Sequence, residues 1–337
     1  MEWIPPNYSF AIPSLYDGIQ LECRLFHPRA PQHVLGASKL EKKAAVVAHP
    51  YVPLGGCFDD PVVGVITHEL LKGGYVVGTF NLRGTGKSEG RTSWTAKPEL
   101  ADYISFYGFM IHYMHRLETN AGKEETAQQA GAKDGSSRGG EATVKIILSG
   151  YSFGSMLATF LPSAEKVVEV FSSTKPGSSV VKVKQAAIEL SEQHNSSLRT
   201  RNCQPSTQKP ESNGRKEKSL QLSPPSVLYL LVSPILPPVS LLVTMSFVTS
   251  QNALSTTADG LRVTGLEPEE ALTNHHSLAV YGSRDAFTSA KRLQNWSGKL
   301  SSKPGSLFQS VEVQRAGHFW REAETESLMR EAIREFI

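Results

Sequence analysis

Cysteine is scarce in this sequence, and its few copies lie far apart. The three cysteines are Cys23, Cys57 and Cys203, and no two of them form a Cys-x-x-Cys pair. Neither a disulfide framework nor a zinc site is therefore expected. The first six residues also lack the basic start and the apolar run of a secretory signal. Together these features predict free thiols in a reducing compartment, and we expect the protein to be cytoplasmic.

The chain also lacks a strong charge of either sign and a long uninterrupted apolar run. Its 35 basic and 32 acidic residues leave a net charge of +3, which gives no reason to expect nucleic acid as a partner. Residues 227–243 are strongly apolar, but Pro234, Pro237 and Pro238 interrupt them. Because a membrane span needs about 20 apolar residues in succession, no span is expected. A buried strand at 227–232, followed by a proline-rich loop, fits the pattern better.

Short β-rich runs alternate with helical stretches along most of the 337 residues. Residues 44–48 and 75–80 are continuous apolar runs, which are typical of strands covered on both faces. In residues 61–72 the apolar side chains recur near the helical period of 3.6 residues. The same reasoning predicts strands at 10–13, 19–26, 146–148, 227–232, 277–281 and 307–313, and helices at 98–116 and 322–337. The alternation predicts an α/β fold in one domain, residues 1–337, with a mostly parallel central sheet and helices on both faces.

Two polar stretches interrupt this alternation. Residues 117–142 and 172–223 are rich in small and charged residues and contain few large apolar ones. Such segments bury too little apolar surface to offset the entropy of ordering, so both are predicted to be surface insertions or disordered loops. Within the second, residues 179–190 are apolar enough for a strand or a helix, whereas residues 191–218 are the most polar part. Residues 234–273 are predicted to form a lid and substrate wall.

The strongest chemical signal is the pentapeptide Gly150-Tyr151-Ser152-Phe153-Gly154. It follows a predicted strand and precedes a helix-like run at 155–161, which is the strand–turn–helix context of a nucleophile elbow. A serine on so sharp a turn needs neighbours without side chains that would clash, and glycine supplies them. The following helix would direct its N-terminal N–H groups toward charge that develops near Ser152. Ser152 is therefore the candidate nucleophile.

A nucleophilic serine needs a base, and the base needs an acid that orients it. Of the ten histidines, His318 lies between the last predicted strand and the last predicted helix. Asp285 follows the predicted strand at 277–281. Open α/β sheets place their sites at the carboxyl ends of the strands, and all three residues fall at such positions. Ser152, Asp285 and His318 therefore form a candidate catalytic triad.

At this point the chain resembles the α/β-hydrolase superfamily of serine hydrolases. The segments that carry the resemblance are the elbow, His49-Pro50 with Gly55-Gly56, the stretch 81–90, the Gly-x-x-Asp segment that ends at Asp285, and Ala-Gly-His-Phe around His318. The chain order of nucleophile, acid and histidine is also that of the superfamily. The pair His-Pro…Gly-Gly is similar to the motif that a small uncharacterised group carries after its third strand. The resemblance covers about residues 10–116, 143–171 and 225–337.

The resemblance implies an oxyanion hole formed by the backbone N–H groups of Phe153 and Tyr51, and it assigns His49 to shaping the oxyanion loop rather than to the role of base. It implies hydrolysis of a carboxylic ester with a small or medium acyl group, without a metal ion or an organic cofactor. Acyl transfer or thioester hydrolysis on the same triad is the nearest alternative. A non-catalytic binding protein on a hydrolase fold is the other. The expected partner is a small-molecule ester, and the oligomeric state is left open.

Two other patterns in the sequence have simple explanations that need no metal ion or nucleotide. His112 and His115 are three residues apart on a predicted helix, a spacing that suits metal binding, but no carboxylate pattern accompanies them. A helix surface is the favoured interpretation. Residues 81–88 nearly match a phosphate-binding loop, which requires glycine where Asn81 stands. A glycine-rich loop after a strand explains this segment, and nucleotide binding is not expected.

Overall fold

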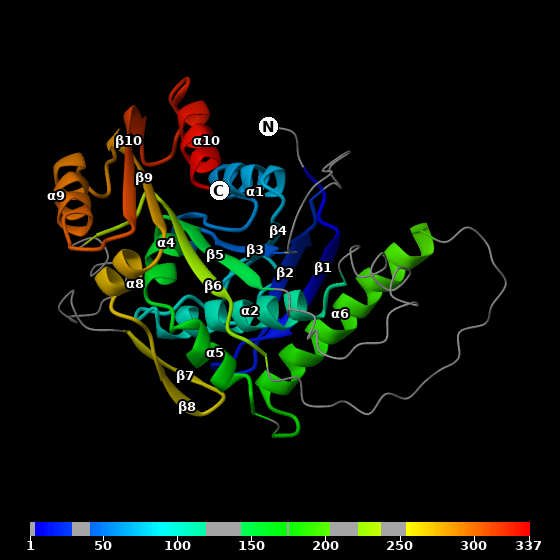
Figure 1. Ribbon diagram of the computed structural model, residues 1–337. Coiled ribbons are helices and arrows are strands. Elements are labelled where there is room, and N and C mark those ends of the chain that lie inside the picture. The colour runs from blue at the N-terminus through cyan, green and yellow to red at the C-terminus, as the bar shows by residue number, and fades with distance from the viewer. Residues whose placement is uncertain (1–3, 29–40, 119–142, 174, 203–221, 237–253) are drawn as a thin grey trace, which may run out of the picture.

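The computed structural model describes residues 4–28, 41–118, 143–173, 175–202, 222–236 and 254–337, and its centre is a sheet of eight strands (Figure 1). The strands are β1 (Tyr8–Pro13), β2 (Gln20–Phe26), β3 (Lys42–Ala48), β4 (Val76–Phe80), β5 (Val144–Tyr151), β6 (Ser226–Val232), β9 (Ser277–Arg284) and β10 (Phe308–Gly317). Their order across the sheet is β1-β2-β4-β3-β5-β6-β9-β10. β2 pairs antiparallel with β1 and β4, and the other neighbours in this sheet are parallel. The predicted mostly parallel α/β sheet is confirmed.

The central strands are buried on both faces because apolar side chains occupy consecutive positions along them. In β3, Ala44, Val46 and Ala48 pack in one hydrophobic core, and Ala45 and Val47 pack in a second core on the other side. Successive side chains of a strand point to opposite faces, so a run of this kind is stable only where helices cover both faces.

Helices supply that cover. α1 (Pro61–Lys72) and α10 (Thr325–Phe336) pack on one face, and Figure 1 shows them side by side. The opposite face carries α2 (Lys97–Arg116), α4 (Phe153–Thr159), α5 (Ala164–Val170) and α6 (Ser179–Asn202). α1 has the predicted bounds, and α2 and α10 differ from theirs by a few residues at most. α9 (Ala290–Ser301), which the sequence analysis did not predict, lies beside β9 and β10 at the sheet edge.

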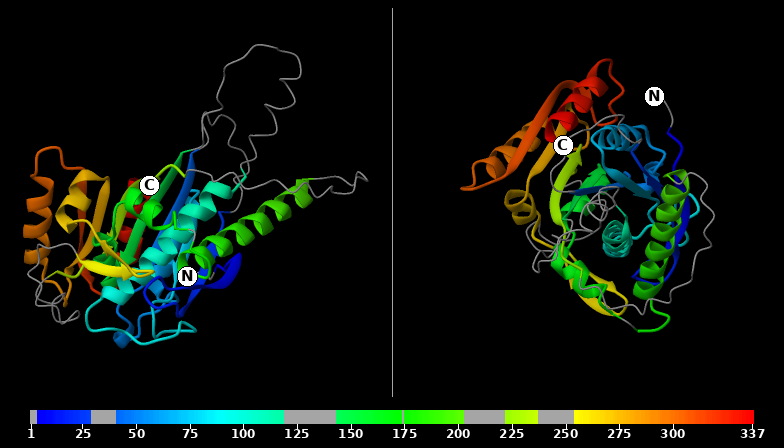
Figure 2. Two further views of the ribbon diagram at one scale, coloured as in Figure 1. Left: turned by 90° about the horizontal axis from the view of Figure 1, so that it is seen from below. Right: turned by 45° about the vertical axis from the view of Figure 1, so that its right-hand side comes forward.

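The second polar stretch is corrected in part, because α6 continues through residues 191–202, where a loop was expected. The buried face of α6 begins with the apolar Val180, Val183 and Ala187 and continues with Ser191 and Asn195. The Asn195 side-chain NH₂ donates to the Arg116 carbonyl, and the Asn195 side-chain oxygen accepts from the backbone N–H of Glu118, just beyond α2, each at 3.0 Å. Polar side chains with satisfied hydrogen bonds therefore extend the helix. Figures 1 and 2 show α6 lying alongside α2.

The predicted lid, residues 234–273, contains two described strands and most of a described helix. An antiparallel hairpin consists of β7 (Ser255–Ala258) and β8 (Leu261–Thr264), and α8 (Pro268–Asn274) follows it. Residues 237–253 lie outside the described part of the chain, as do residues 119–142 and 203–221 of the two polar stretches. Among the helices of the described ranges, none combines the length and apolar character needed to cross a membrane.

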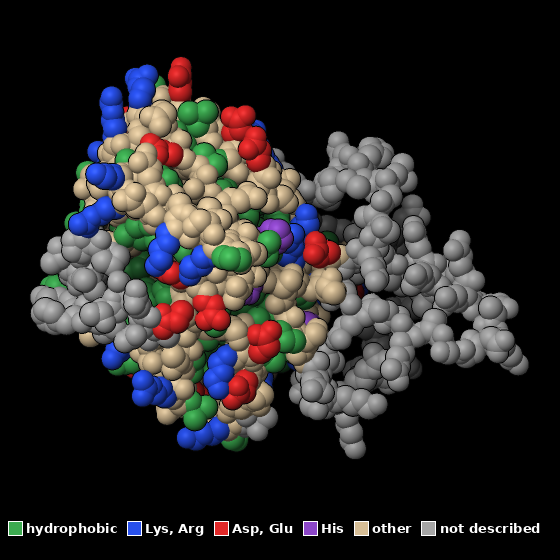
Figure 3. All heavy atoms as spheres, turned by 60° about the vertical axis from the view of Figure 1, so that its left-hand side comes forward, with side chains coloured by type: hydrophobic (Ala, Val, Ile, Leu, Met, Phe, Trp, Pro, Cys, Tyr) green, Lys and Arg blue, Asp and Glu red, His purple; other side chains and the backbone are tan. Residues whose placement is uncertain are grey.

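Charged side chains of both signs are mixed on the surface. On the face that Figure 3 shows, acidic and basic side chains are interspersed, and no area of one sign dominates it. Between α8 and α9, Lys299 and Lys303 both form ion pairs with Glu269, at 2.6 and 2.8 Å. Exposed pairs of this kind stabilise the fold by at most about 1 kcal/mol each, so the cores rather than the surface charges hold the sheet and helices together.

Candidate active site

Ser152 lies on a sharp turn between β5 and α4, in the strained geometry that the pentapeptide predicts. Its φ of 55° and ψ of −113° are rare for a residue with a side chain. A Cβ at Gly150 would lie 2.2 Å from the Gly154 carbonyl carbon, and a Cβ at Gly154 would lie 2.3 Å from the Ala48 carbonyl oxygen. Both glycines are therefore required by close backbone packing, which lets the turn sit against the end of β3.

The structure brings Ser152, His318 and Asp285 together in one chain of hydrogen bonds. His318 Nε2 lies 2.9 Å from Ser152 Oγ, and His318 Nδ1 lies 2.7 Å from Asp285 Oδ2. A carboxylate can only accept, so Nδ1 carries a proton and Nε2 is free to accept from the serine hydroxyl. The side chains of His318 and Asp285 are 3% and 0% exposed, so water competes little for these bonds.

Strand order explains why residues so distant in sequence meet. β5, β6, β9 and β10 are consecutive and parallel, so the segments that follow them lie at one edge of the sheet. Ser152 follows β5, Asp285 follows β9, and His318 follows β10. The backbone N–H of Ser152 donates to the Val232 carbonyl at the end of β6, at 2.9 Å. This bond fixes Ser152 to the strand that separates it from the other two residues.

The Asp285 carboxylate is held by the backbone as well as by His318. Its Oδ1 accepts from the N–H groups of Phe287 and Thr288, at 2.8 and 3.0 Å, while Oδ2 faces the imidazole. The Phe287 ring packs against His318 with centroids 4.3 Å apart. The Asp285 carboxylate therefore has one fixed orientation, and one side of the imidazole is covered.

Tyr51 and Phe153, predicted from the resemblance to contribute oxyanion-hole N–H groups, are neighbours in space. Their rings meet edge to face with centroids 5.2 Å apart. Phe153 is the first residue of α4, and the first N–H groups of a helix have no acceptor within it. Tyr51 directly precedes the short 3₁₀ turn Val52–Leu54, and its carbonyl accepts from Gly56 at 3.1 Å. A Cβ at Gly56 would lie 2.1 Å from the Pro50 carbonyl oxygen, so this tight loop requires glycine there.

His49, the alternative base, has both ring nitrogens engaged by the backbone. Nδ1 lies 2.7 Å from the Pro50 carbonyl oxygen, and Nε2 accepts from the Leu82 N–H at 2.9 Å. Burial lowers the pKa of His49 to about 4, so the ring is neutral near pH 7. His49 thus joins the Tyr51 loop to the segment after β4 and is not available to deprotonate Ser152.

The other histidine pattern does not form a metal site in the described part of the chain. His112 is buried rather than on the helix surface as expected, because α2 is covered along most of its length, and its ring packs on Phe171 with centroids 5.6 Å apart. Burial lowers the pKa of His112 to about 3. The second histidine of the pattern, His115, has its Nε2 atom 2.9 Å from the Ser223 carbonyl oxygen. Among the described residues, no group of three or more His, Cys, Asp or Glu side chains could hold a metal ion.

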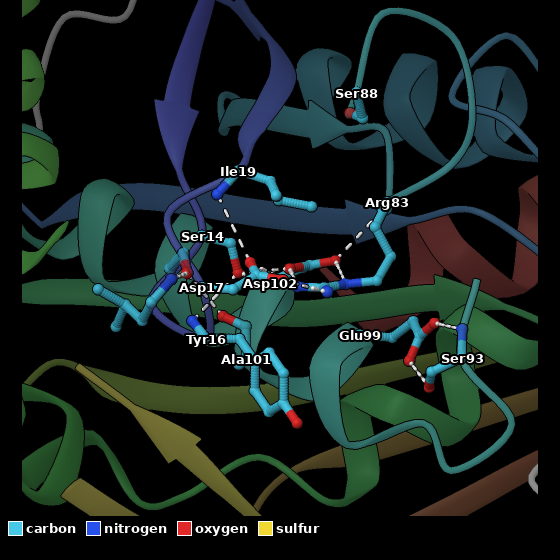
Figure 4. Close-up of polar contacts among 12 residues, drawn as sticks. Ser14, Tyr16, Asp17, Ile19, Arg83, Ser88, Ser93, Glu99, Ala101 and Asp102 are labelled. Atoms are coloured by element: carbon cyan, nitrogen blue, oxygen red, sulfur yellow. Dashed lines mark hydrogen bonds and ion pairs between the residues drawn. The ribbon is translucent and has the colours of Figure 1, made fainter. Parts of the chain in front are cut away.

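A buried polar network that sequence reasoning missed lies beside this edge of the sheet (Figure 4). The Arg83 guanidinium donates to both carboxylate oxygens of Asp102, at 2.7 and 2.9 Å, and to Asp17 at 2.9 Å. The Ser14 hydroxyl donates to Asp102 at 2.6 Å. The network joins the loop after β4 to α2 and to the β1–β2 turn.

A Cβ at Gly86 would lie 2.1 Å from Asn81 Nδ2, which explains a glycine of this loop without a nucleotide.

Comparisons with known proteins agree with this architecture. No protein-family model matches the sequence, and no significantly similar sequence was found among the curated proteins. An α/β serine hydrolase homologue from Coxiella burnetii is similar in structure, with a TM-score of 0.50 and 15% identity over 99% of each chain. An α/β serine hydrolase without a lid from Xanthomonas campestris gives a TM-score of 0.49 and 15% identity, over 99% of this chain and 96% of that one. The chain has the α/β-hydrolase fold.

Proposed function

We propose that this protein is a serine hydrolase that cleaves a carboxylic ester through an acyl-enzyme on Ser152. The observation that carries the proposal is the buried chain of hydrogen bonds from Ser152 Oγ through His318 to Asp285, with distances of 2.9 and 2.7 Å. It combines with a nucleophile in strained backbone geometry at the start of a helix. An arrangement of this kind activates a serine hydroxyl, which alone is a weak nucleophile.

In the acylation step, Ser152 Oγ attacks the ester carbonyl carbon while His318 Nε2 takes the hydroxyl proton. Asp285 stabilises the imidazolium that results and keeps the proton on Nδ1. Negative charge develops on the carbonyl oxygen, and the N–H groups of Phe153 and Tyr51 donate to it. The intermediate then collapses, the C–O bond to the alcohol breaks, and His318 returns its proton to the leaving alkoxide.

In the deacylation step, water replaces the alcohol. His318 Nε2 takes a proton from the water, whose oxygen attacks the acyl carbon and forms a second tetrahedral intermediate at the same N–H groups. The bond from the acyl carbon to Ser152 Oγ breaks, and His318 returns the proton to the serine. The products are a carboxylic acid and an alcohol. The sequence of steps uses residues of this chain and water alone.

Reactivity of the nucleophile tests the proposal. A fluorophosphonate probe should label Ser152, and Ser152→Ala should lose both labelling and hydrolysis of p-nitrophenyl esters, because loss of a triad member costs several powers of ten in rate. Ser149→Ala is a matched control, since the Ser149 hydroxyl is buried three residues away and has no hydrogen-bond partner. It should keep its labelling. Labelling that persists in Ser152→Ala, or no labelling of the parent protein, would reject the proposal and favour a binding protein.

The same assay defines the acyl group and the acceptor. A series of p-nitrophenyl esters of increasing chain length reports the size of the acyl pocket through kcat/KM. Adding an alcohol or amine distinguishes hydrolysis from acyl transfer, because a transferase partitions its acyl-enzyme to the added acceptor rather than to water. We expect release of the free acid to dominate. Transfer as the main outcome would retain the triad and change the reaction assigned to it.

A further inference from the structure

Tyr151, the residue before the nucleophile, is bonded directly to the segment that carries the histidine. It is the last residue of β5, the residue is 2% exposed, and its hydroxyl donates to the His318 carbonyl oxygen at 2.9 Å. The Tyr151 and His318 rings are 5.5 Å apart between centroids. One hydrogen bond therefore joins the backbone of the histidine to the strand that ends at Ser152.

The histidine segment has an irregular backbone, and side-chain hydrogen bonds attach it to neighbouring strands. His318 lies just beyond β10, and the pairing of β10 with β9 shifts in register between Val313 and Gly317. Two further hydrogen bonds attach it to neighbouring strands: the Arg315 N–H donates to Ser283 Oγ on β9 at 2.8 Å, and the Trp320 indole N–H donates to Ser233 Oγ, just after β6, at 3.0 Å. Trp320 itself has a positive φ of 54°. Of these bonds, the one from Tyr151 is made to the backbone of His318 itself.

We propose that Tyr151 is a positioning residue for the reaction: its hydroxyl holds the His318 backbone so that Nε2 stays within hydrogen-bond distance of Ser152 Oγ. The inference rests on the proposed function and goes beyond it, since the Tyr151 hydroxyl bonds to the backbone of His318 rather than to a side chain of the triad. A displacement of about 1 Å in a catalytic group can cost about 100-fold in rate, so an anchor at this point acts on kcat. It has little reason to act on substrate binding.

The hydroxyl of Tyr151, rather than its aromatic ring, holds the His318 backbone in place. The ring packs in the core with Val62, Ile147 and Val232, and phenylalanine would keep that packing. Burial raises the pKa of the Tyr151 hydroxyl, so it remains protonated and remains a donor across the pH range of ordinary assays. Removing one oxygen atom therefore removes the attachment and leaves the surrounding core in place.

Tyr151→Phe tests the proposal, with Tyr103→Phe as the matched control. Tyr103 is also buried, and its hydroxyl also donates to a backbone carbonyl, that of Ser149 at 2.8 Å, but it has no bond to the histidine segment. We expect kcat of Tyr151→Phe to fall about tenfold with KM within about twofold, since the loss concerns alignment rather than binding. Tyr103→Phe should keep kcat within about twofold at a similar cost in thermal stability.

A proton NMR signal gives a readout that loss of stability alone does not move. The Nδ1 proton of His318, held by Asp285, should give a downfield resonance that shifts or broadens in Tyr151→Phe and stays in place in Tyr103→Phe. Placing 4-aminophenylalanine at position 151 restores a donor and should restore most of kcat. If Tyr151→Phe does not fold, Ser233→Ala, which removes the bond from Trp320 in the same loop, should show the same loss of kcat at unchanged KM.

Three outcomes would overturn the inference: kcat of Tyr151→Phe within twofold of the parent, an equal loss in Tyr103→Phe, or an unmoved imidazole resonance. Each is distinguishable from failure of the proposed function. If Ser152→Ala abolishes labelling while Tyr151→Phe is fully active, the serine hydrolase stands and the positioning role is rejected. If Ser152→Ala remains active, both are rejected.

Discussion

Replacing Asp285 with asparagine should abolish most of the activity, because the backbone around it dictates how the amide must sit. Oδ1 accepts from the N–H groups of Phe287 and Thr288, and Oδ2 accepts from His318 Nδ1. An asparagine side chain has one oxygen that can accept, and the N–H groups of Phe287 and Thr288 would both donate to it. The amide NH₂ group must therefore face His318, where it can only donate.

This orientation forces the wrong tautomer on the imidazole. To accept from the amide, Nδ1 must lose its proton, so the proton moves to Nε2 and points at Ser152 Oγ, 2.9 Å away. The base can then no longer accept the serine proton. Amidation of a triad aspartate costs about 10⁴-fold in kcat, which corresponds to about 5 kcal/mol of transition-state stabilisation. We expect a loss of that order in Asp285→Asn, with little change in folding.

Ester hydrolysis by Asp285→Asn should be compared with that by Asp60→Asn. The Asp60 carboxylate is also close enough to His318 to affect its electrostatics, but its Oδ1 accepts from the Val62 N–H as the N-cap of α1. Asparagine caps a helix as well as aspartate, so Asp60→Asn should keep its activity within about threefold. A loss below tenfold in Asp285→Asn, or a larger loss in Asp60→Asn, would refute the assignment of the acid.

Two further predictions concern stability. Gly154→Ala should lose probe labelling and unfold at a lower temperature, because its Cβ would lie 2.3 Å from a backbone oxygen. In Gly298→Ala the new Cβ lies in open space within α9, so the free energy of unfolding, measured with urea, should rise by up to about 1 kcal/mol. His112 has a pKa of about 3 when folded and about 6.5 when unfolded, so the unfolded chain binds its proton first and stability falls as pH drops between these values. His112→Phe should flatten this dependence by up to about 1.4 kcal/mol per pH unit, and equal differences between pH 7 and pH 5 in both proteins would contradict it.

Much of the architecture could be predicted because its determinants are local in sequence. The apolar run of β3 and the helical period of α1 each mark an element that the structure contains, and the strands end where Ser152, Asp285 and His318 begin their loops. Parallel strands then place those loops at one edge of the sheet, so the predicted strands already indicate that the three side chains lie close together. The chain of hydrogen bonds among them is what the structure adds.

The supporting contacts could not be predicted, since each joins residues whose sequence contexts are unremarkable. Arg83 and Asp102 form a buried ion pair, yet neither lies in a pattern that distinguishes it from a solvated surface charge. The bond from the Tyr151 hydroxyl to His318 spans 167 positions and ends on a carbonyl, which every residue possesses. Contacts between a side chain and a distant backbone leave no spacing in the sequence, so only coordinates reveal them.

α6 extends beyond its predicted end for a different reason, because one face of the helix is buried although its average composition is polar. Residues 191–202 do contain few apolar side chains, but a helix is ordered by what one face meets rather than by its average composition. Val183, Ala187, Ser191 and Asn195 recur every four residues and form one buried stripe. The Ser191 hydroxyl donates to the Ile188 carbonyl oxygen at 2.7 Å, and the Asn195 amide donates to the Arg116 carbonyl at the end of α2, so both polar side chains are hydrogen-bonded. A polar segment that follows an amphipathic one should therefore be tested for continuation of its stripe, with small or amide side chains counted as able to be buried, before it is assigned to a loop.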